Sequence, residues 1–227
     1  CKLPKDLEIL GGDAKQMYPD YLGCCKSLDD NMGRLIEKLK EKGLYNNTII
    51  IYSSDHGSHF KTRNREPYLK GFDDYKRTCH DSALKVPLII SGGIFKGGKV
   101  VEEIVSTSSL PKTIIAMAGV DVGNLLDKEI DENKVIFAQI SESRVGRCIR
   151  TKDYLYSVYA PDCNGWDEGT SYKYEEEFLY DLRQDPYELN NLIDDKTTLD
   201  IRKELSKKLI KQMELAGEKN VRIIIKE

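Results

Sequence analysis

TIIIYSSDHG, residues 48–57, is an apolar run that ends abruptly in an acid, an imidazole and a glycine. Its β-branched and aromatic content predicts a buried strand over residues 48–54. A strand that stops here delivers Asp55 and His56 to the carboxyl edge of a sheet, where open α/β folds bind ligands. The other two histidines of the chain, His59 and His80, follow within the same segment. This clustering indicates a site.

An amphipathic helix precedes the strand. Apolar residues recur at three- and four-residue steps over residues 14–42, and the pattern ends in lysines followed by Gly43. A helix followed by a buried strand indicates an α/β sheet with covered faces. Further along, the sequence predicts these elements: a buried strand over 86–91, a short strand over 100–105, a helix over 108–118 with Pro111 in its first turn, and a third core strand over 135–140.

The pattern changes near residue 142. Alternating strands surround a turn at residues 151–153, another strand covers 177–182, and a second amphipathic helix covers 199–215. We therefore expect residues 1–141 to be the C-terminal part of an α/β domain that carries the site. Residues 142–227 are expected to form a small subdomain of antiparallel sheet and C-terminal helix. The acidic run EEE at residues 175–177 is interpreted as solvated surface.

Composition narrows the function classes. The 227 residues carry a net charge of −3, which argues against a nucleic-acid binder. No apolar run approaches the roughly 20 residues that span a bilayer. Six cysteines without a CxxC pair are interpreted as reduced thiols, most of them buried. The start, CKLPKDLEILGG, predicts a fragment from which any targeting segment is missing, so the compartment stays open.

The order of these motifs resembles the C-terminal half of a sulfatase of the alkaline phosphatase superfamily. The motifs, which span roughly residues 18–215, are LDDNMGRLIEKLKEKGLYNNT, IIIYSSDHG, YKRTCHDSALKVPLIISGG and FLYDLRQDPYELNNL. The resemblance implies an alkaline-phosphatase-like sheet flanked by helices, followed by the small antiparallel subdomain. It also implies that the chain is a fragment of the full fold.

The resemblance implies that Asp55 and His56 complete a divalent cation site; many relatives have asparagine at the second position. The expected ion is calcium, which prefers oxygen ligands. Imidazole suits zinc or manganese better, so these ions remain open. An Asp-His pair can also be turn chemistry, with Asp55 capping the residues that follow. Its position at the end of a strand favours ligation.

The resemblance also implies that Lys76 contacts the sulfate group, since a compact ammonium with three donors suits a tetrahedral anion. A histidine can protonate the leaving alkoxide near neutral pH, and the sequence does not choose between His59 and His80. Lys61 and Arg63 are the expected substrate-binding residues, and a basic surface loop is the plainer alternative for both. Together with residues 68–75 they are expected to select sulfated sugars.

Part of the family pattern is absent. The family nucleophile is a cysteine or serine in C/S-x-P-S-R, converted to formylglycine, and the sequence has no such motif. Cys1 precedes a proline, but that proline comes one place too late. The early paired aspartates of the metal site are also missing, because Asp29 and Asp30 lie on the predicted helix. The chain is thus expected to carry half an active site and to be inactive alone, with formylglycine in a missing N-terminal part.

Three interpretations follow. The first is a sulfuric ester hydrolase acting on a sulfated small molecule or glycan. The second is a phosphodiesterase or phosphonate hydrolase of the same superfamily, although two-metal relatives need more than three histidines. The third is a non-catalytic domain that binds an anion or glycan, or that supports a partner half. The upstream sequence would discriminate among them, because a C/S-x-P-S-R motif there supports the sulfatase.

Overall fold

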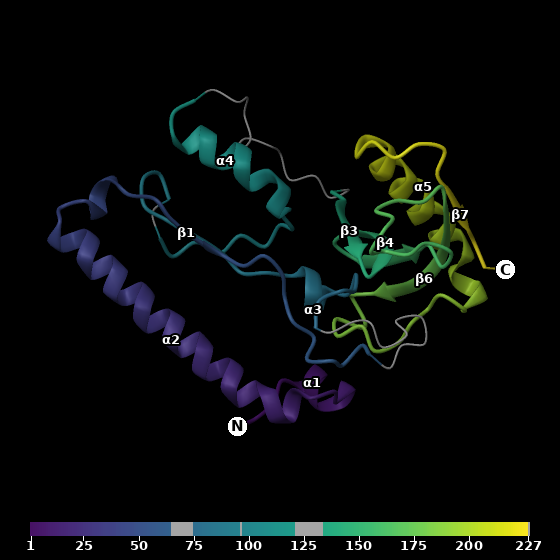
Figure 1. Ribbon diagram of the computed structural model, residues 1–227, viewed down its shortest axis with the longest axis horizontal. Coiled ribbons are helices and arrows are strands. Elements are labelled where there is room, and N and C mark those ends of the chain that lie inside the picture. The colour runs from purple at the N-terminus through teal and green to yellow at the C-terminus, as the bar shows by residue number, and fades with distance from the viewer. Residues whose placement is uncertain (65–74, 96, 121–133, 227) are drawn as a thin grey trace. The chain divides into compact units, whose positions relative to one another are not determined.

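The computed structural model describes residues 1–64, 75–95, 97–120 and 134–226 (Figure 1). The chain divides into two compact units, Cys1–Val101 and Glu102–Glu227. We refer to them as the N-terminal unit and the C-terminal unit. The sequence predicted a domain boundary between residues 141 and 142. The division into compact units after Val101 does not test that boundary. It stays a prediction.

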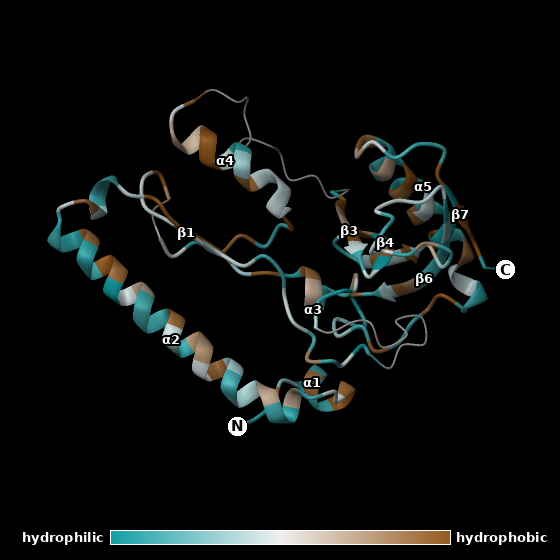
Figure 2. Cartoon of the chain, viewed as in Figure 1, coloured by the Kyte–Doolittle hydropathy of each residue, from teal (hydrophilic) through white to brown (hydrophobic). Residues whose placement is uncertain are grey.

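The N-terminal unit begins with α1 (Lys5–Leu10) and the long helix α2 (Ala14–Glu41). α2 confirms the helix predicted over residues 14–42. Two lysines occupy its last turn, where they face the negative end of the helix dipole. Figure 2 shows apolar residues recurring along α2 among polar ones. Leu28 and Leu35, on the predicted apolar face, are exposed.

A two-stranded sheet carries the run TIIIYSS that precedes Asp55. β1 (Ile50–Ser53) follows the short η1 (Tyr45–Asn47) and pairs antiparallel with β2 (Leu88–Ser91). Both strands were predicted, but the expectation that they are buried is wrong. β1 is half-buried along its whole length, and Ile89 of β2 is 60% exposed. Among the described residues these two strands pair only with each other.

The segment that follows contains one confirmed element and one wrong prediction. η3 (Thr107–Ser109) and α4 (Leu110–Met117) confirm the predicted helix, with Pro111 in its first turn. The chain leaves α4 at Gly119, whose φ of 83° is accessible to glycine without strain. Residues 100–105 form no strand. Val100 and Val101 are exposed there, because a β-branched run without a partner strand has no ladder to join.

The C-terminal unit is built on a five-stranded sheet in the order β3-β4-β5-β6-β7. Its strands are β3 (Ile136–Glu142), β4 (Arg144–Arg150), β5 (Tyr154–Tyr159), β6 (Lys173–Asp181) and β7 (Arg222–Ile224). Each of the first four strands pairs antiparallel with the next one along the chain, and β7 runs parallel to β6. The pairing of β4 with β5 confirms the hairpin predicted around residues 151–153. The strand expected over residues 135–140 forms, but as the edge strand of this sheet. It was predicted to be a third core strand of the α/β domain, and that part of the prediction is wrong.

Helix α5 (Leu199–Leu215), preceded by η4 (Lys196–Thr198), covers this sheet and confirms the predicted helix (Figure 1). Its buried face presents Leu205, Leu209 and Met213 to the core. Full burial of each such side chain contributes roughly 1.5–3 kcal/mol. Side chains of the sheet complete the core: Val145, Ile149, Tyr156, Val158, Tyr174 and Leu179.

The DPYELNNL motif has a structural role. The carboxylate of Asp185 accepts hydrogen bonds from the backbone amides of Leu189 and Asn190. The side-chain oxygen of Asn191 accepts from the amide of Leu179 on β6, at 3.0 Å, and from that of Ile193. The motif therefore closes a turn and ties it to the sheet.

The acidic run on β6 is not solvated surface, so that expectation is wrong. Glu176 and Glu177 are both buried. Glu177 has no partner residue on β5, as in a β-bulge, which redirects its side chain. Three carboxylates of this unit each pair with an arginine: Glu176 with Arg202, Glu177 with Arg144, and Glu218 with Arg147. We refer to these six residues as the buried ion-pair set.

Hydroxyl groups complete this set. Tyr156 donates to Glu176 at 3.0 Å, Ser157 donates to Glu177 at 2.7 Å, and Tyr174 donates to Glu218 at 2.8 Å. Burial, followed by the nearby Glu176 charge, raises the pKa of Tyr156 well above its usual range. The neutral hydroxyl therefore persists as a donor.

All six cysteines are free thiols, as predicted, although Cys1 and Cys24 are exposed rather than buried. Among the described residues, no helix combines the length and the apolar character needed to cross a membrane.

Candidate active site

Asp55, His56 and Gly57 follow β1, separated from its last residue by Ser54 alone. The Asp55 side chain is 83% exposed and that of His56 is 40% exposed. The charge of His56 is the main cause that lowers the pKa of Asp55, followed among the lowering causes by a hydrogen bond from the His56 amide. Gly57 is required at its position, because a Cβ there would lie 2.3 Å from the carbonyl oxygen of Ser82. The chain thus presents a carboxylate and an imidazole to solvent from a tightly held turn.

The chemistry of this pair fits part of a cation site. His56 Nδ1 lies 2.7 Å from the carbonyl oxygen of Gly57, so Nδ1 carries the proton and donates it. In the neutral ring Nε2 is then left with a lone pair, the form that binds metals. Nε2 and Asp55 Oδ2 are 3.6 Å apart. Two donors that each lie about 2.0–2.5 Å from one cation can be at most about 5 Å apart.

This pair supplies two ligands only. Among the residues that the structure describes, no group of three or more His, Cys, Asp or Glu side chains is arranged to hold a metal. Asp29 and Asp30 lie on α2, as the sequence predicted.

Two backbone hydrogen bonds place the turn after β1 beside the segment formed by residues 75–83. The amide of Gly57 donates to the carbonyl of Ala83 at 2.7 Å. The amide of His59 donates to the carbonyl of Tyr75 at 2.9 Å. The two stretches that carry the candidate residues are therefore neighbours in space.

The candidate residues differ in burial. His59 and His80 are fully buried, and Arg63 is nearly so. His80 precedes α3 (Asp81–Leu84), and its Nδ1 lies 2.6 Å from the hydroxyl of Thr78. Lys76 is half-buried. That these side chains converge on one substrate remains a prediction.

Lys61 already has a counter-ion. Its ammonium lies 3.7 Å from Asp13 Oδ2 and 5.0 Å from the centre of the Tyr75 ring. The hydroxyl of Tyr75, followed by Asp13, raises the pKa of Lys61 above its ordinary value. The side chain is 44% exposed, so this charge remains accessible to an anionic substrate.

The turn that directly follows His59 is strained. Phe60 and Lys61 have φ angles of 50° and 55°, in the left-handed region that favours glycine. Each such residue costs of order 1–3 kcal/mol, and strain of this kind concentrates at functional sites. The sequence carries no pattern that predicts this turn, and it did not indicate Asp13 as a residue near the site. Tyr75 ends the stretch of residues 68–75 that was expected to help select the substrate.

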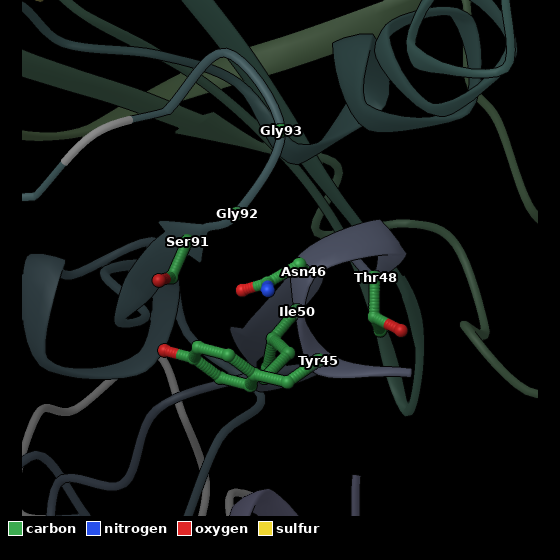
Figure 3. A pocket seen from close by; sticks show the side chains of 7 residues that line it. All are labelled: Tyr45, Asn46, Thr48, Ile50, Ser91, Gly92 and Gly93. Atoms are coloured by element: carbon green, nitrogen blue, oxygen red, sulfur yellow. The ribbon is translucent and has the colours of Figure 1, made fainter. Parts of the chain in front are cut away.

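A separate pocket of about 210 Å³ lies at the other end of β1 (Figure 3). Figure 3 shows the residues that line it: Tyr45, Asn46, Thr48, Ile50, Ser91, Gly92 and Gly93. Because Ile50 pairs with Ser91 at the start of β1, this pocket is remote from Asp55 along the strand. It does not belong to the candidate site.

Comparison with known proteins defines the class. The family model described as Sulfatase matches residues 5–120, just over half of the chain. The chain belongs to the sulfatase family. It is 27% identical over 208 residues to an N-acetylglucosamine-6-O-sulfatase of Bacteroides thetaiotaomicron, an alignment that covers 83% of this chain and 34% of that protein. The chain spans about a third to two fifths of the length of the curated relatives it matches.

Solved structures show the same fold. A protein in complex with its substrate D-glucosamine-2-N,6-O-disulfate superimposes with a TM-score of 0.69 at 24% identity, over 88% of this chain and 41% of that one. The phosphonate monoester hydrolase of Agrobacterium radiobacter gives a TM-score of 0.62 at 21% identity, over 82% of this chain and 39% of that one. These likenesses confirm the predicted alkaline-phosphatase-like fold and the prediction that the chain corresponds to a part of it.

Proposed function

We propose that this chain provides part of the active site of a sulfuric ester hydrolase that acts on sulfated carbohydrates. Membership of the sulfatase family supports the reaction class over the phosphonate hydrolase. The observation that carries the proposal is the pair of hydrogen bonds, from Gly57 to Ala83 and from His59 to Tyr75. They keep the Asp55–His56 turn next to Lys76.

In this proposal Asp55 and His56 bind a divalent cation through Oδ2 and Nε2. A bound cation would neutralise negative charge that accumulates around the sulfuryl group. Calcium is the ion that the family resemblance favours, and zinc and manganese are the ions that an imidazole ligand favours. The choice among them is part of the test.

Lys76 is assigned to the sulfate group. Lys76 as a residue is half-buried, and an ammonium that enters a site shielded from water interacts with a developing negative charge more strongly than a fully solvated one. His59 or His80 acts as the general acid toward the leaving alkoxide. Lys61 and Arg63 bind the anionic sugar, with Lys61 the more accessible of the two.

The nucleophile is not among these residues, because the sequence has no C/S-x-P-S-R motif. We propose that formylglycine is supplied from a part of the protein outside this sequence. The isolated chain is then inactive, and the binding roles of Asp55, His56 and Lys76 can be measured without turnover.

The test is sulfate release from 6-O-sulfated glucosamine by the protein made from its complete open reading frame. We expect Lys76→Ala and Asp55→Asn each to lower kcat/KM at least a hundredfold. Arg63→Ala should lower it less, mainly through KM. A wild-type protein that releases phosphonate or phosphate but no sulfate would contradict the proposal.

A further inference from the structure

The strained turn after His59 is held against the start of α2. The amide of Asp13 donates to the carbonyl of Phe60 at 2.9 Å. Gly12, with a φ of 60°, passes so close that a Cβ would lie 2.3 Å from the Phe60 oxygen and 2.8 Å from the Thr62 nitrogen. Position 12 therefore requires glycine, both for its φ and for this approach.

The Asp13 side chain reaches both stretches of the candidate site. Its Oδ2 accepts a hydrogen bond from the Tyr75 hydroxyl at 3.0 Å and lies 3.7 Å from the Lys61 ammonium. The side chain is 22% exposed, so water screens these contacts only in part. Tyr75 precedes Lys76 and accepts the amide hydrogen of His59. One carboxylate thus connects Tyr75, which precedes Lys76, with Lys61, which lies two residues after His59.

Apolar packing supports the same arrangement. The Phe60 ring is buried and packs edge-on against Tyr18 and Tyr21 of α2, with centroid distances of 5.8 and 5.5 Å. Leu7 of α1 and Ala14 complete this cluster. A left-handed phenylalanine persists only when its surroundings determine its conformation, and these contacts do so.

We propose that Asp13 is a positioning residue of the active site. Its amide fixes the turn at residues 59–62 and its carboxylate fixes Tyr75, so that His59 and Lys76 keep a constant separation. The catalytic meaning of this inference rests on the proposed function. The mechanical part, that Asp13 restrains both stretches, stands on the contacts above.

Hydrogen exchange of the 227-residue chain tests the mechanical part. In Asp13→Ala, we expect the His59 amide to exchange at least tenfold faster, because Tyr75 loses its anchor. Tyr75→Phe removes one hydroxyl only and should give a smaller acceleration at the same amide. Asp30→Asn is the control, since Asp30 of the same helix pairs with exposed Lys26. Unchanged exchange at His59 in both variants would overturn the inference.

A glycine pair separates the close approach from backbone strain. Gly12→Ala should speed exchange at Thr62, because the added methyl pushes the turn away. Gly43→Ala also places alanine at a positive φ, of 68°, but meets nothing within 4 Å. Equal effects of the two substitutions at Thr62 would contradict the role of the Gly12 contact.

Kinetics with the complete open reading frame test the catalytic part. Asp13→Ala should lower kcat for sulfate release at least tenfold while KM changes less than threefold. In a Lys76→Ala background the same substitution should cause no further loss, because Asp13 acts through the group already removed. Additive losses would reduce Asp13 to a structural role and overturn the inference. If the wild type releases no sulfate, the proposed function fails and the exchange experiment still decides whether Asp13 restrains the turn.

Discussion

The two units use charged residues in opposite ways. In the C-terminal unit, each carboxylate of the buried ion-pair set is out of water and paired with an arginine. In the N-terminal unit, Asp55 is largely exposed just after β1, and it contacts its neighbours in the chain, the His56 ring and the Ser54 hydroxyl. Charges that are buried and paired define a rigid sheet. An exposed pair of ligand-type groups on a tightly held turn is available to bind.

The energetic consequences also differ. A buried charge whose partner is removed is left uncompensated in a medium that solvates it poorly. An exposed charge whose neighbour is removed is solvated by water, and the loss is small. The comparison therefore predicts that mutations of charged residues separate into two groups, those that change stability and those that change binding.

Arg202→Ala should give the largest loss of stability. It leaves Glu176 buried without its guanidinium partner, 2.5 Å away in the native structure, and should cost about 3–5 kcal/mol. Urea denaturation followed by tyrosine fluorescence measures this loss. Arg183→Ala is the control, because the Arg183 side chain is 51% exposed, so water screens its ion pair with Asp181. A loss below about 1 kcal/mol for Arg202→Ala would remove the distinction between the two units.

Leu209→Ala should come next. Leu209 lies on the face of α5 that packs on the sheet and is fully buried. The substitution should therefore cost about 2–5 kcal/mol through lost burial and a cavity. Leu215→Ala on the same helix is the matched control, because Leu215 is 74% exposed and should change the free energy of unfolding by less than about 0.5 kcal/mol. Similar losses at the two positions would mean that α5 does not pack on the sheet as described.

The contrast between the units also explains what the sequence could predict. Helices α2 and α5 were predicted within one residue of their ends, because periodicity and terminal residues are local signals. The burial of Glu176 and Glu177 was missed because their partners lie 26 and 33 residues away. A run of three glutamates without these arginines resembles surface.

For the candidate site as well, the local features were predictable from the sequence and the long-range contacts were not. The strand pattern places Asp55 just after the end of β1, and the family motif indicates residues 75–83 as the second part of the site. The contact from Asp13 to Lys61 was out of reach, because it depends on two left-handed residues that no local pattern encodes. The strand expected over residues 100–105 failed for a related reason, since strand formation depends on a distant partner.

A smaller effect is expected from Asp181→Asn. Hydrogen bonds from Arg183 are the main cause that lowers the pKa of Asp181 below its ordinary value of about 3.9. A carboxyl whose pKa is lowered in the folded state stabilises the fold above the unfolded pKa, and this contribution is lost as pH falls through the folded pKa.

The difference in unfolding free energy between wild type and Asp181→Asn should therefore be constant near neutral pH and should shrink below about pH 4. Because Arg183 is half exposed, the full difference should stay below about 1 kcal/mol. Urea titrations at several pH values measure it. A difference that grows on acidification would contradict the assigned direction.

Asp55→Asn should have the smallest effect on stability, within about 0.5 kcal/mol, because its side chain is exposed. Its effect on cation binding should be large, at least a tenfold loss of affinity measured by calorimetry with calcium, zinc and manganese. Asp20→Asn, at another exposed aspartate, should leave both quantities unchanged. A destabilised Asp55→Asn chain with unaltered cation affinity would assign Asp55 to turn structure instead.

Paramagnetic broadening of the amide resonances of this chain by manganese tests whether the turn after β1 and residues 75–83 form one site. Binding at Asp55 and His56 should broaden residues 55–59 and also residues 75–83, and Asp55→Asn should abolish both effects. Broadening confined to the turn after β1, with the amides around Lys76 unaffected, would contradict the central claim that the two stretches form one site.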